Sequence, residues 1–360
     1  MAVFPDTSCL PPLLATAVGS LPHEDPLQAV EMITAKLTTA PHAPQLSRSN
    51  PREQMWIQFT ENLPGFKVDF ENLSYHFDTS SVSDAAVEQF FTHYLDVLEG
   101  GTPDYFAVGP QYGQGIHALL ERLARDGTRA PFFKVQVTGP LSFALTVTDE
   151  SRKPIFYHPV FRDVAVKAMG LKAVWLLEQF KPFADEIIVF FDEPSLSAYG
   201  SSALLGVSKE DVIDSLNDVI SMVADRGGIP GVHCCGNTDW GLIMETAAGI
   251  VNFDAVDYME TMKIYRDELT AFLGRGGVLA WGAVPNTERI REETVEDVIG
   301  RIRQGIRMLV DAGVDRDALA RRIIVTPACG CAGLTTGDTQ RVYEILAELE
   351  SINPERVQGD

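Results

Sequence analysis

The segment that decides the fold is Glu-Ile-Ile-Val-Phe-Phe-Asp-Glu-Pro, at residues 186–194. Five consecutive apolar residues, three of them β-branched, are typical of a parallel strand that is covered on both faces. The run ends in two carboxylates and a proline. Polar residues that follow a strand in this way form the active sites of barrels built from parallel strands. The segment therefore predicts an α/β fold with its functional groups at the carboxyl ends of the strands.

Seven further apolar segments recur along the chain, and stretches of helical length separate most of them. Together with the first they give eight expected strands, at residues 14–18, 43–46, 133–137, 186–191, 231–235, 250–253, 278–281 and 323–326. Helix ends are marked by capping patterns at 208–211 and 294–297, and by glycine pairs at 227–228 and 276–277. This alternation predicts a single (β/α)₈ TIM barrel over residues 1–360.

The interval between the second and third expected strands is far longer than one crossover helix needs. Residues 49–131 contain helical patterns at 83–99 and 114–125. We interpret this segment as a helical insertion that forms a lid over the barrel mouth. A small separate domain is the alternative.

The composition excludes several classes of function. The chain has 360 residues and a formal net charge of −21, without a run of basic residues, which argues against nucleic-acid binding. We find no apolar stretch of membrane-spanning length and no signal-peptide pattern at the start, so we expect a cytoplasmic protein that does not bind membranes. In such a chain, clustered cysteines indicate a metal or catalytic site more than disulfides.

The strongest motif is Val-His-Cys-Cys-Gly at 232–236, paired with Thr-Pro-Ala-Cys-Gly-Cys at 326–331. Each follows an expected strand, the fifth and the eighth. Because side chains at i and i+2 of a strand point the same way, His233 and Cys235 should face the barrel mouth together, with Cys234 turned elsewhere. One imidazole and two thiolates suit a zinc site with an open fourth position. Cys329 is the preferred third ligand and Cys331 the alternative; the plainer interpretation is that all are buried apolar cysteines.

Two carboxylates close the fourth expected strand. Asp192 is a candidate for binding a substrate ammonium group, and the alternative is a cap on the next helix. For Glu193 we weigh substrate binding against a structural ion pair or a supporting role behind the site.

Other strand ends carry weaker signals. Gly19 and Ser20 follow the first strand, where backbone N–H groups and a hydroxyl can approach a carboxylate. His23 is a candidate proton donor or an ordinary surface residue. Asp254 ends the sixth expected strand as a candidate oxygen ligand to zinc or a loop carboxylate.

Taken in order, these motifs resemble the catalytic C-terminal barrel of cobalamin-independent methionine synthase, within the superfamily that includes corrinoid-dependent thiol methyltransferases and uroporphyrinogen decarboxylase. The resemblance runs through nearly the whole chain, at residues 18–22, 138–140, 192–194, 233–235, 253–254 and 327–330. It implies that His233, Cys235 and Cys329 bind zinc. It also implies that Ser20 holds the homocysteine carboxylate and Asp192 its amine. Asp254 stands where the family has a longer glutamate ligand.

The resemblance implies an enzyme that activates homocysteine as a zinc thiolate and methylates it to methionine. The family's usual N-terminal barrel, which helps to hold folate polyglutamate, is missing, so we expect a methyl-corrinoid donor, either methylcobalamin or a corrinoid protein. A folate donor would need a proton donor such as His23. The alternatives are methylation of another thiol, such as coenzyme M, and a non-catalytic protein with structural zinc.

Overall fold

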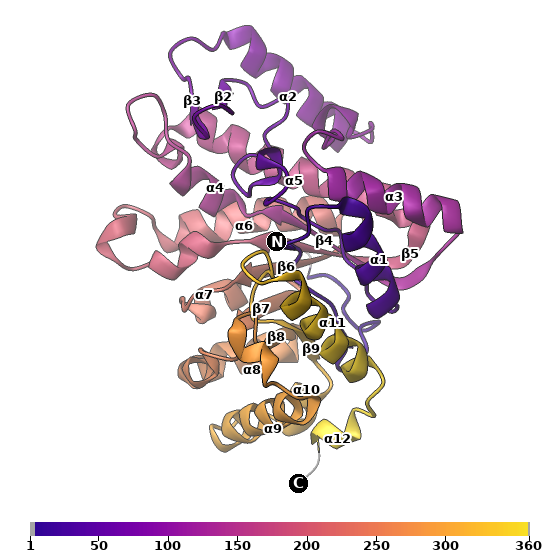
Figure 1. Ribbon diagram of the computed structural model, residues 1–360. Helices are drawn as coiled ribbons and strands as arrows, with labels where there is room; N and C mark the ends of the chain where they lie inside the picture. The colour runs from indigo at the N-terminus through magenta and orange to yellow at the C-terminus, as the bar shows by residue number, and fades with distance from the viewer. Residues whose placement is uncertain (1–3, 359–360) are drawn as a thin grey trace.

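A curled sheet of seven parallel strands forms the centre of the molecule (Figure 1). The computed structural model describes residues 4–358. In sheet order the strands are β1 (Leu14–Ala15), β9 (Ile323–Pro327), β8 (Val278–Val284), β7 (Ile250–Asp254), β6 (Ile229–Cys234), β5 (Ala184–Asp192) and β4 (Ala130–Thr138). Nearly all of their residues are buried, as continuous apolar strands require.

Residues 43–46, the expected second strand, lie in the gap between β1 and β4. Parallel bridges join His42 to Lys134 on one side and Gln45 to Ser20 on the other. These bridges complete the ring between the two edge strands, so all eight expected strand positions are occupied. The predicted (β/α)₈ barrel is confirmed.

The helices surround this sheet in Figure 1. They are α1 (Pro26–Lys36), α2 (Asp84–Leu98), α3 (Gln114–Asp126), α4 (Pro140–Thr146), α5 (Pro159–Phe180), α6 (Lys209–Ala224), α7 (Trp240–Glu245), α8 (Arg266–Gly274), α9 (Val295–Asp311), α10 (Arg316–Ala320), α11 (Thr336–Glu350) and α12 (Glu355–Gln358). Short 3₁₀ turns are η1 (Pro51–Glu53), η2 (Asp104–Phe106), η3 (Ile155–Tyr157), η4 (Lys181–Phe183), η5 (Pro194–Ala198), η6 (Ser202–Leu204), η7 (Met259–Tyr265) and η8 (Glu288–Arg291). Within residues 4–358 none of these helices has the length and apolar character needed to cross a membrane.

The expected helix ends are present. Ser208 with Asp211, and Thr294 with Asp297, form complete capping boxes at the starts of α6 and α9. Gly227 and Gly276 have φ values of 76° and 104°, in the left-handed region that ends a helix.

The long segment at 49–131 divides into two parts. An antiparallel hairpin of β2 (Phe66–Asp69) and β3 (Ser74–Phe77), together with α2, lies at one end of the molecule in Figure 1, far from α9 and α12. Helix α3, in contrast, packs against α1 and takes the place of the second barrel helix. The extent of the insertion over residues 49–131 stays a prediction. Its role as a lid stays a prediction.

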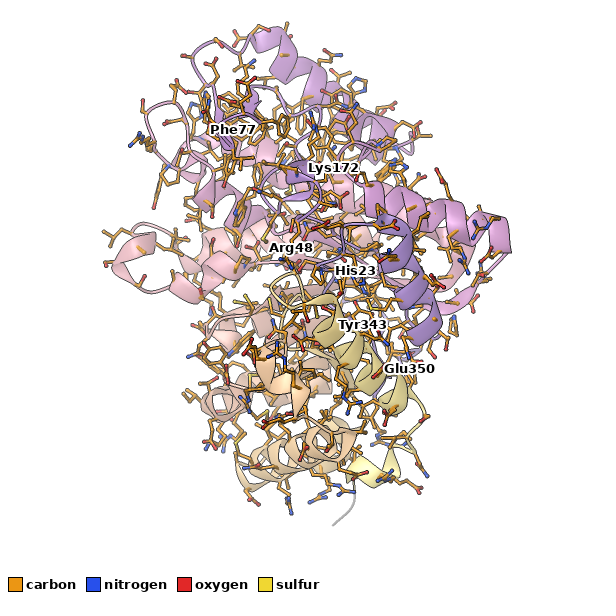
Figure 2. The ribbon with its side chains drawn as sticks, viewed as in Figure 1. His23, Arg48, Phe77, Lys172, Tyr343 and Glu350 are labelled. Carbon is orange, nitrogen blue, oxygen red and sulfur yellow. The ribbon has the colours of Figure 1, made fainter. Side chains whose placement is uncertain are left out.

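A buried lysine joins this additional structure to the barrel. Lys172 on α5 is fully buried, and its Nζ donates to the carbonyl oxygens of Glu61 and Ala107 at 3.0 and 2.8 Å (Figure 2). Because an unpaired ammonium in an apolar interior is very unfavourable, these two carbonyls are required partners. The contact holds residues 61 and 107 against α5.

Candidate metal centre

Two strand ends supply the predicted ligands. His233 lies on β6 and Cys235 directly follows it, while Cys329 lies two residues beyond β9. The alternation of side chains along β6 turns His233 and Cys235 to the same side. Cys234 points away from them, is fully buried, and lies 3.5 Å from Gly236 O. The structure thus brings together the three residues that the sequence predicted.

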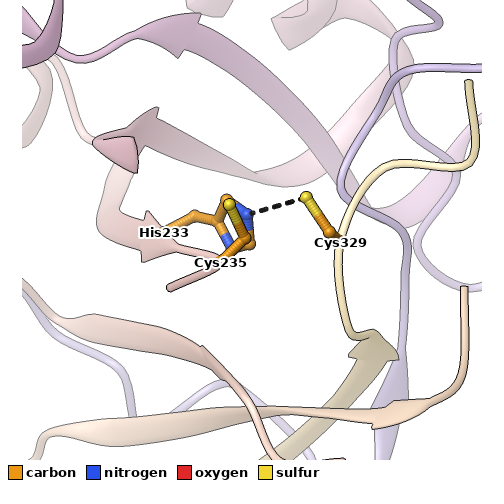
Figure 3. A group of neighbouring side chains, drawn as sticks. All are labelled: His233, Cys235 and Cys329. Atoms are coloured by element: carbon orange, nitrogen blue, oxygen red, sulfur yellow. Dashed lines mark hydrogen bonds between the residues drawn. The ribbon is translucent and has the colours of Figure 1, made fainter. Parts of the chain in front are cut away.

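The three donor atoms lie close enough to share one ion. The side-chain nitrogen of His233 and the sulfurs of Cys235 and Cys329 lie within 4.8 Å of one another. His233 Nε2 and Cys329 Sγ are 3.8 Å apart (Figure 3). Zinc bonds of about 2.0–2.1 Å to nitrogen and 2.3 Å to sulfur, at tetrahedral angles, place ligand atoms roughly 3.5–3.8 Å apart. The donor set fits zinc in its chemistry, and the distance between His233 and Cys329 also matches zinc coordination.

The three donors also change one another's protonation. A hydrogen bond with Cys329, followed by one with His233, lowers the pKa of Cys235 to about 4. The contact with Cys235, followed by burial, raises the pKa of Cys329 well above its usual value. Burial lowers the pKa of His233, but Cys235 and Asp192 outweigh it and the net pKa is raised. The opposite pKa shifts of the two thiols come from the contact between their side chains, and a divalent cation would displace their protons on binding.

Cys331 does not join this group. It is buried, its backbone N–H donates to Ser20 O at 2.8 Å, and burial raises the pKa of its thiol to about 12. A thiol in this state is a small apolar side chain rather than a metal ligand. The preference for Cys329 over Cys331 agrees with this geometry.

Asp254 also lies outside the cluster in the described residues. Its Oδ1 accepts hydrogen bonds from the backbone N–H groups of Val256 and Asp257 at 2.8 and 3.0 Å. The carboxylate thus orders the loop after β7, as the alternative interpretation expected. Ligation of zinc by Asp254 stays a prediction without a supporting contact.

Asp192 has the features of a substrate-binding carboxylate. It ends β5 and pairs in register with His233 on β6. Its Oδ1 is buried and has no hydrogen-bond partner among the described residues. Burial raises its pKa, while the charges of His233 and Lys134 oppose that rise. An unpaired buried acceptor beside the metal ligands is suited to an incoming cationic group.

Ser20 lies against the loop that carries the third ligand. A Cβ at Gly330 would collide with Ser20 Oγ, so the two chain segments approach as closely as glycine allows. Gly19 has a φ of 142°, and a Cβ there would strike the side chain of Gln136. The Gly19-Ser20 turn is therefore beside Cys329, where the sequence predicted a carboxylate site.

A buried polar network beneath this turn was missed at the sequence level. Lys134 on β4 is fully buried, and its Nζ donates to Val18 O and to Gln136 Oε1. Gln136 Nε2 in turn donates to Ala43 O at 2.9 Å. This network fixes the backbone just before Gly19. The signal was available, since Lys134 lies between the apolar residues Phe133 and Val135 of β4.

The contacts of Glu193 favour the structural one of its two expected roles. This residue is fully buried, and its two oxygens accept the backbone N–H groups of Leu141 and Ser142 at 3.0 and 2.7 Å. Both oxygens are thus occupied at the start of α4, where a carboxylate also stabilises the helix dipole. Burial raises the pKa of Glu193 to about 7. Its role is structural, so it is not available to bind substrate.

His23 is buried, contrary to the surface alternative, and its Nδ1 has no partner among residues 4–358. Burial lowers its pKa, and the nearby charge of Asp25 opposes that effect. His23 does not belong to the metal-ligand group. Its role as a proton donor stays a prediction.

The fold and the donor set define a class: (β/α)₈ barrels with one imidazole and two thiols at the mouth. No protein-family model matches the chain, and no curated protein does. Among solved structures, the chain is similar to a B12-independent methionine synthase from Shewanella sp. W3-18-1, with a TM-score of 0.55 and 16% identity. It is also similar to a methyltransferase from Methanosarcina mazei, with a TM-score of 0.54 and 12% identity. Each match covers 94% of this chain.

These likenesses confirm the expected resemblance at the level of fold. The matches cover 97% of the Shewanella chain and 94% of the Methanosarcina chain. A protein named as a methionine synthase therefore exists with a single barrel of this length. The length of the given chain consequently does not by itself indicate which methyl donor is used.

Proposed function

We propose that the protein is a zinc-dependent methyltransferase that transfers a methyl group to the thiol of homocysteine, forming methionine. The observation that carries this proposal is the approach of His233, Cys235 and Cys329 to within 4.8 Å, beside an unpaired carboxylate oxygen of Asp192. The likeness in fold to a methionine synthase and a methyltransferase supports the same class of reaction.

The donor set favours zinc over harder cations, because thiolates and imidazole are its preferred protein ligands. Zinc held by these three residues would supply a redox-silent Lewis acid that lowers the pKa of a substrate thiol. With neutral His233 and two cysteinates the centre is formally neutral. Soft, electron-rich ligands keep a substrate sulfur nucleophilic, whereas more oxygen ligands would favour Lewis acidity over nucleophilicity.

The chain's own residues orient the substrate. Asp192 accepts hydrogen bonds from the ammonium group of homocysteine, and Ser20 with the Gly19 backbone binds its carboxylate. These two contacts fix the sulfur relative to the incoming methyl group, which contributes through orientation. The new sulfur–carbon bond forms while the donor–methyl bond breaks, and the bonding electron pair leaves with the donor.

For the donor we propose a methyl-corrinoid, free or on a carrier protein. A corrinoid leaves as reduced cobalt and needs no proton, whereas a folate nitrogen must be protonated as it leaves. A folate donor is the alternative, with His23 as the proton source.

Two other functions compete. A thiol without an amine, such as coenzyme M, would leave the buried Asp192 oxygen without a partner, which disfavours it. A purely structural zinc site normally has four protein ligands, and only three residues meet in the described cluster.

The first test measures the metal and its response to substrate. We expect about one zinc per chain, and X-ray absorption should detect one more sulfur neighbour after homocysteine is added. Protein without zinc, or an unchanged sulfur count, would contradict the proposal.

The second test is a side-by-side assay of methylcobalamin and methyltetrahydrofolate with homocysteine, with methionine as the measured product. Faster turnover with methylcobalamin supports the corrinoid donor. Turnover with the folate alone would overturn that part of the proposal and leave the thiol chemistry intact.

A further inference from the structure

The side chain of Asn252 links four neighbouring strands beneath the metal ligands. It projects from β7 and is fully buried. Its Oδ1 lies 2.5 Å from His233 Nδ1 on β6. Its Nδ2 donates to Ala280 O on β8 at 2.8 Å and to Thr326 Oγ1 on β9 at 2.9 Å. Every polar atom of this amide therefore has a partner.

The partners determine which way the amide faces. A backbone carbonyl can only accept, so the Asn252 atom facing Ala280 O must be the NH₂ group. Oδ1 then faces His233, and only a protonated Nδ1 can satisfy it. In the neutral imidazole this leaves Nε2 with a free lone pair. Nε2 is also the nitrogen 3.8 Å from Cys329 Sγ, on the side of the other ligands.

We infer that Asn252 is a positioning residue of the metal centre: its amide selects the His233 tautomer that can bind zinc and ties the strand of His233 to the strand that leads to Cys329. The inference rests on the proposed function, because it concerns the ion of that site. Ligands whose second nitrogen is held in this way bind metal more tightly, and loss of the partner typically costs about 10–100-fold in affinity.

The second contact of the amide explains how the two halves of the ligand set stay aligned. Thr326 is fully buried on β9, three residues before Cys329. In the sheet, β7 and β8 lie between β6 and β9, so the backbones of the two ligand strands are not paired with each other. The Asn252 side chain therefore connects His233 on β6 to Thr326 on β9 by hydrogen bonds.

The choice of an amide also fixes the charge of the site. A carboxylate in this position would make the same hydrogen bond to His233 but add a negative charge behind the metal. The neutral Asn252 leaves the two cysteinates as the only anions among the ligands. This difference provides a matched pair of variants.

The experiment compares Asn252→Leu with Asn252→Asp, and the zinc dissociation constant of each is measured by competition with a chelator. Both variants lose the two Nδ2 hydrogen bonds, but only Asn252→Asp retains an acceptor for His233. We expect Asn252→Leu to bind zinc about 10–100-fold more weakly. Asn252→Asp should bind zinc at least as tightly as the unmodified protein, although its metal-free form is less stable.

A merely structural role predicts a different result, in which both variants lose stability and neither differs from the other in zinc affinity. Equal affinities for the two variants would overturn the inference. Asn217→Leu is the control, since Asn217 Oδ1 accepts Ala247 N on the outer helix layer at 2.8 Å. It should reduce stability and leave zinc affinity unchanged.

If the buried carboxylate of Asn252→Asp prevents folding, Asn252→Leu and Thr326→Val decide the question. Thr326→Val removes one acceptor and leaves Ala280 O to orient the amide, so its loss of zinc affinity should be smaller than that of Asn252→Leu. An equal loss in both would contradict the tautomer argument. Failure of the unmodified protein to bind zinc would instead contradict the proposed function, so the two failures are distinguishable.

Discussion

The two sides of the barrel mouth are built differently. The ligand side, from β6 to β9, consists of parallel strands. His233 lies on β6, Cys235 directly follows it, and Cys329 lies two residues beyond β9. The opposite side contains β1, which has only two residues, and the bridged residues 43–46. There the backbone is held by side chains, above all Lys134.

This difference shows how one site can satisfy two demands. Metal ligands need fixed spacing, which strand geometry provides through alternation along a strand and register between strands. A polar substrate needs hydroxyl groups and backbone N–H groups as hydrogen-bond partners. In a regular β-sheet those N–H groups would be paired with the neighbouring strand. Irregular backbone held by buried side chains keeps such groups available. If the two sides act independently, variants on the ligand side should change zinc affinity and variants on the opposite side should change homocysteine binding.

The largest effect should come from the ligand side. Cys235→Ser replaces a thiolate ligand by a hydroxyl that stays protonated, so zinc affinity should fall by more than the roughly 100-fold limit typical of outer-sphere changes. Activity should be lost while the far-ultraviolet circular dichroism stays unchanged. Zinc analysis after dialysis measures the result.

Cys234→Ala is the matched control, because Cys234 is adjacent in sequence but turned away from the cluster. It should retain zinc and activity. Full activity in Cys235→Ser, or zinc loss in Cys234→Ala, would show that the ligand assignment is wrong.

The next effect concerns Asp192, which lies between the two sides. Asp192→Asn removes the charge that pairs with the substrate ammonium. A hydrogen bond between charged groups contributes about 1.5–3 kcal/mol, so homocysteine affinity should fall about 10–150-fold. Zinc content should stay constant. A parallel loss of zinc and homocysteine would remove the proposed amine contact.

A smaller effect is expected on the substrate side. Lys134→Met leaves the acceptors of Val18 and Gln136 without their donor, which should cost about 1–3 kcal/mol in the free energy of unfolding. The Gly19-Ser20 turn should loosen, so KM for homocysteine rises while zinc affinity stays constant. Urea unfolding and steady-state kinetics provide the two readouts.

Lys172→Met is the control for this variant, since Lys172 is an equally buried lysine that donates to the carbonyls of Glu61 and Ala107 and not to the segment before Gly19. It should lower stability to a similar degree without raising KM. An equal rise of KM in both variants would mean that Lys134 acts only through global stability.

The smallest effect is expected at Asp254. Asp254→Asn retains an oxygen acceptor for the N–H groups of Val256 and Asp257, so zinc affinity should change by no more than about twofold, as for substitutions outside key contacts. A large loss of zinc would show that Asp254 moves to ligate the ion. The chelator competition used for Asn252 measures this directly.

The contrast between the two sides also explains what the sequence could predict. The alternation of side chains along β6 was sufficient to predict that His233 and Cys235 face one way and Cys234 the other. The apolar segments were sufficient to predict where the eight strands of the barrel lie. Asn252 and Lys134 were missed because their roles depend on partners far away in the chain. Both nevertheless interrupt apolar strands, and a polar residue inside a strand that is buried on both faces needs a buried partner. That signal could have identified them.

For Glu193 the sequence left two roles open, substrate binding and structural support. Its place beside Asp192 at a strand end suggested a shared role in binding substrate. Neighbouring residues on a strand face opposite ways, however, and Glu193 turns to the start of α4. The preceding loop and short helix that receive its carboxylate cannot be placed from sequence alone.

An ion held by these three residues would be a removable cross-link, because the ligands are far apart along the chain. Cys329 follows His233 by 96 residues, and the intervening chain includes β7, β8 and the helices packed on them. An ion that binds only the folded chain, at a thousand times its dissociation constant, adds about 4 kcal/mol to the free energy of unfolding. The C-terminal half of the barrel would thus resist heat and proteases in proportion to the zinc supply.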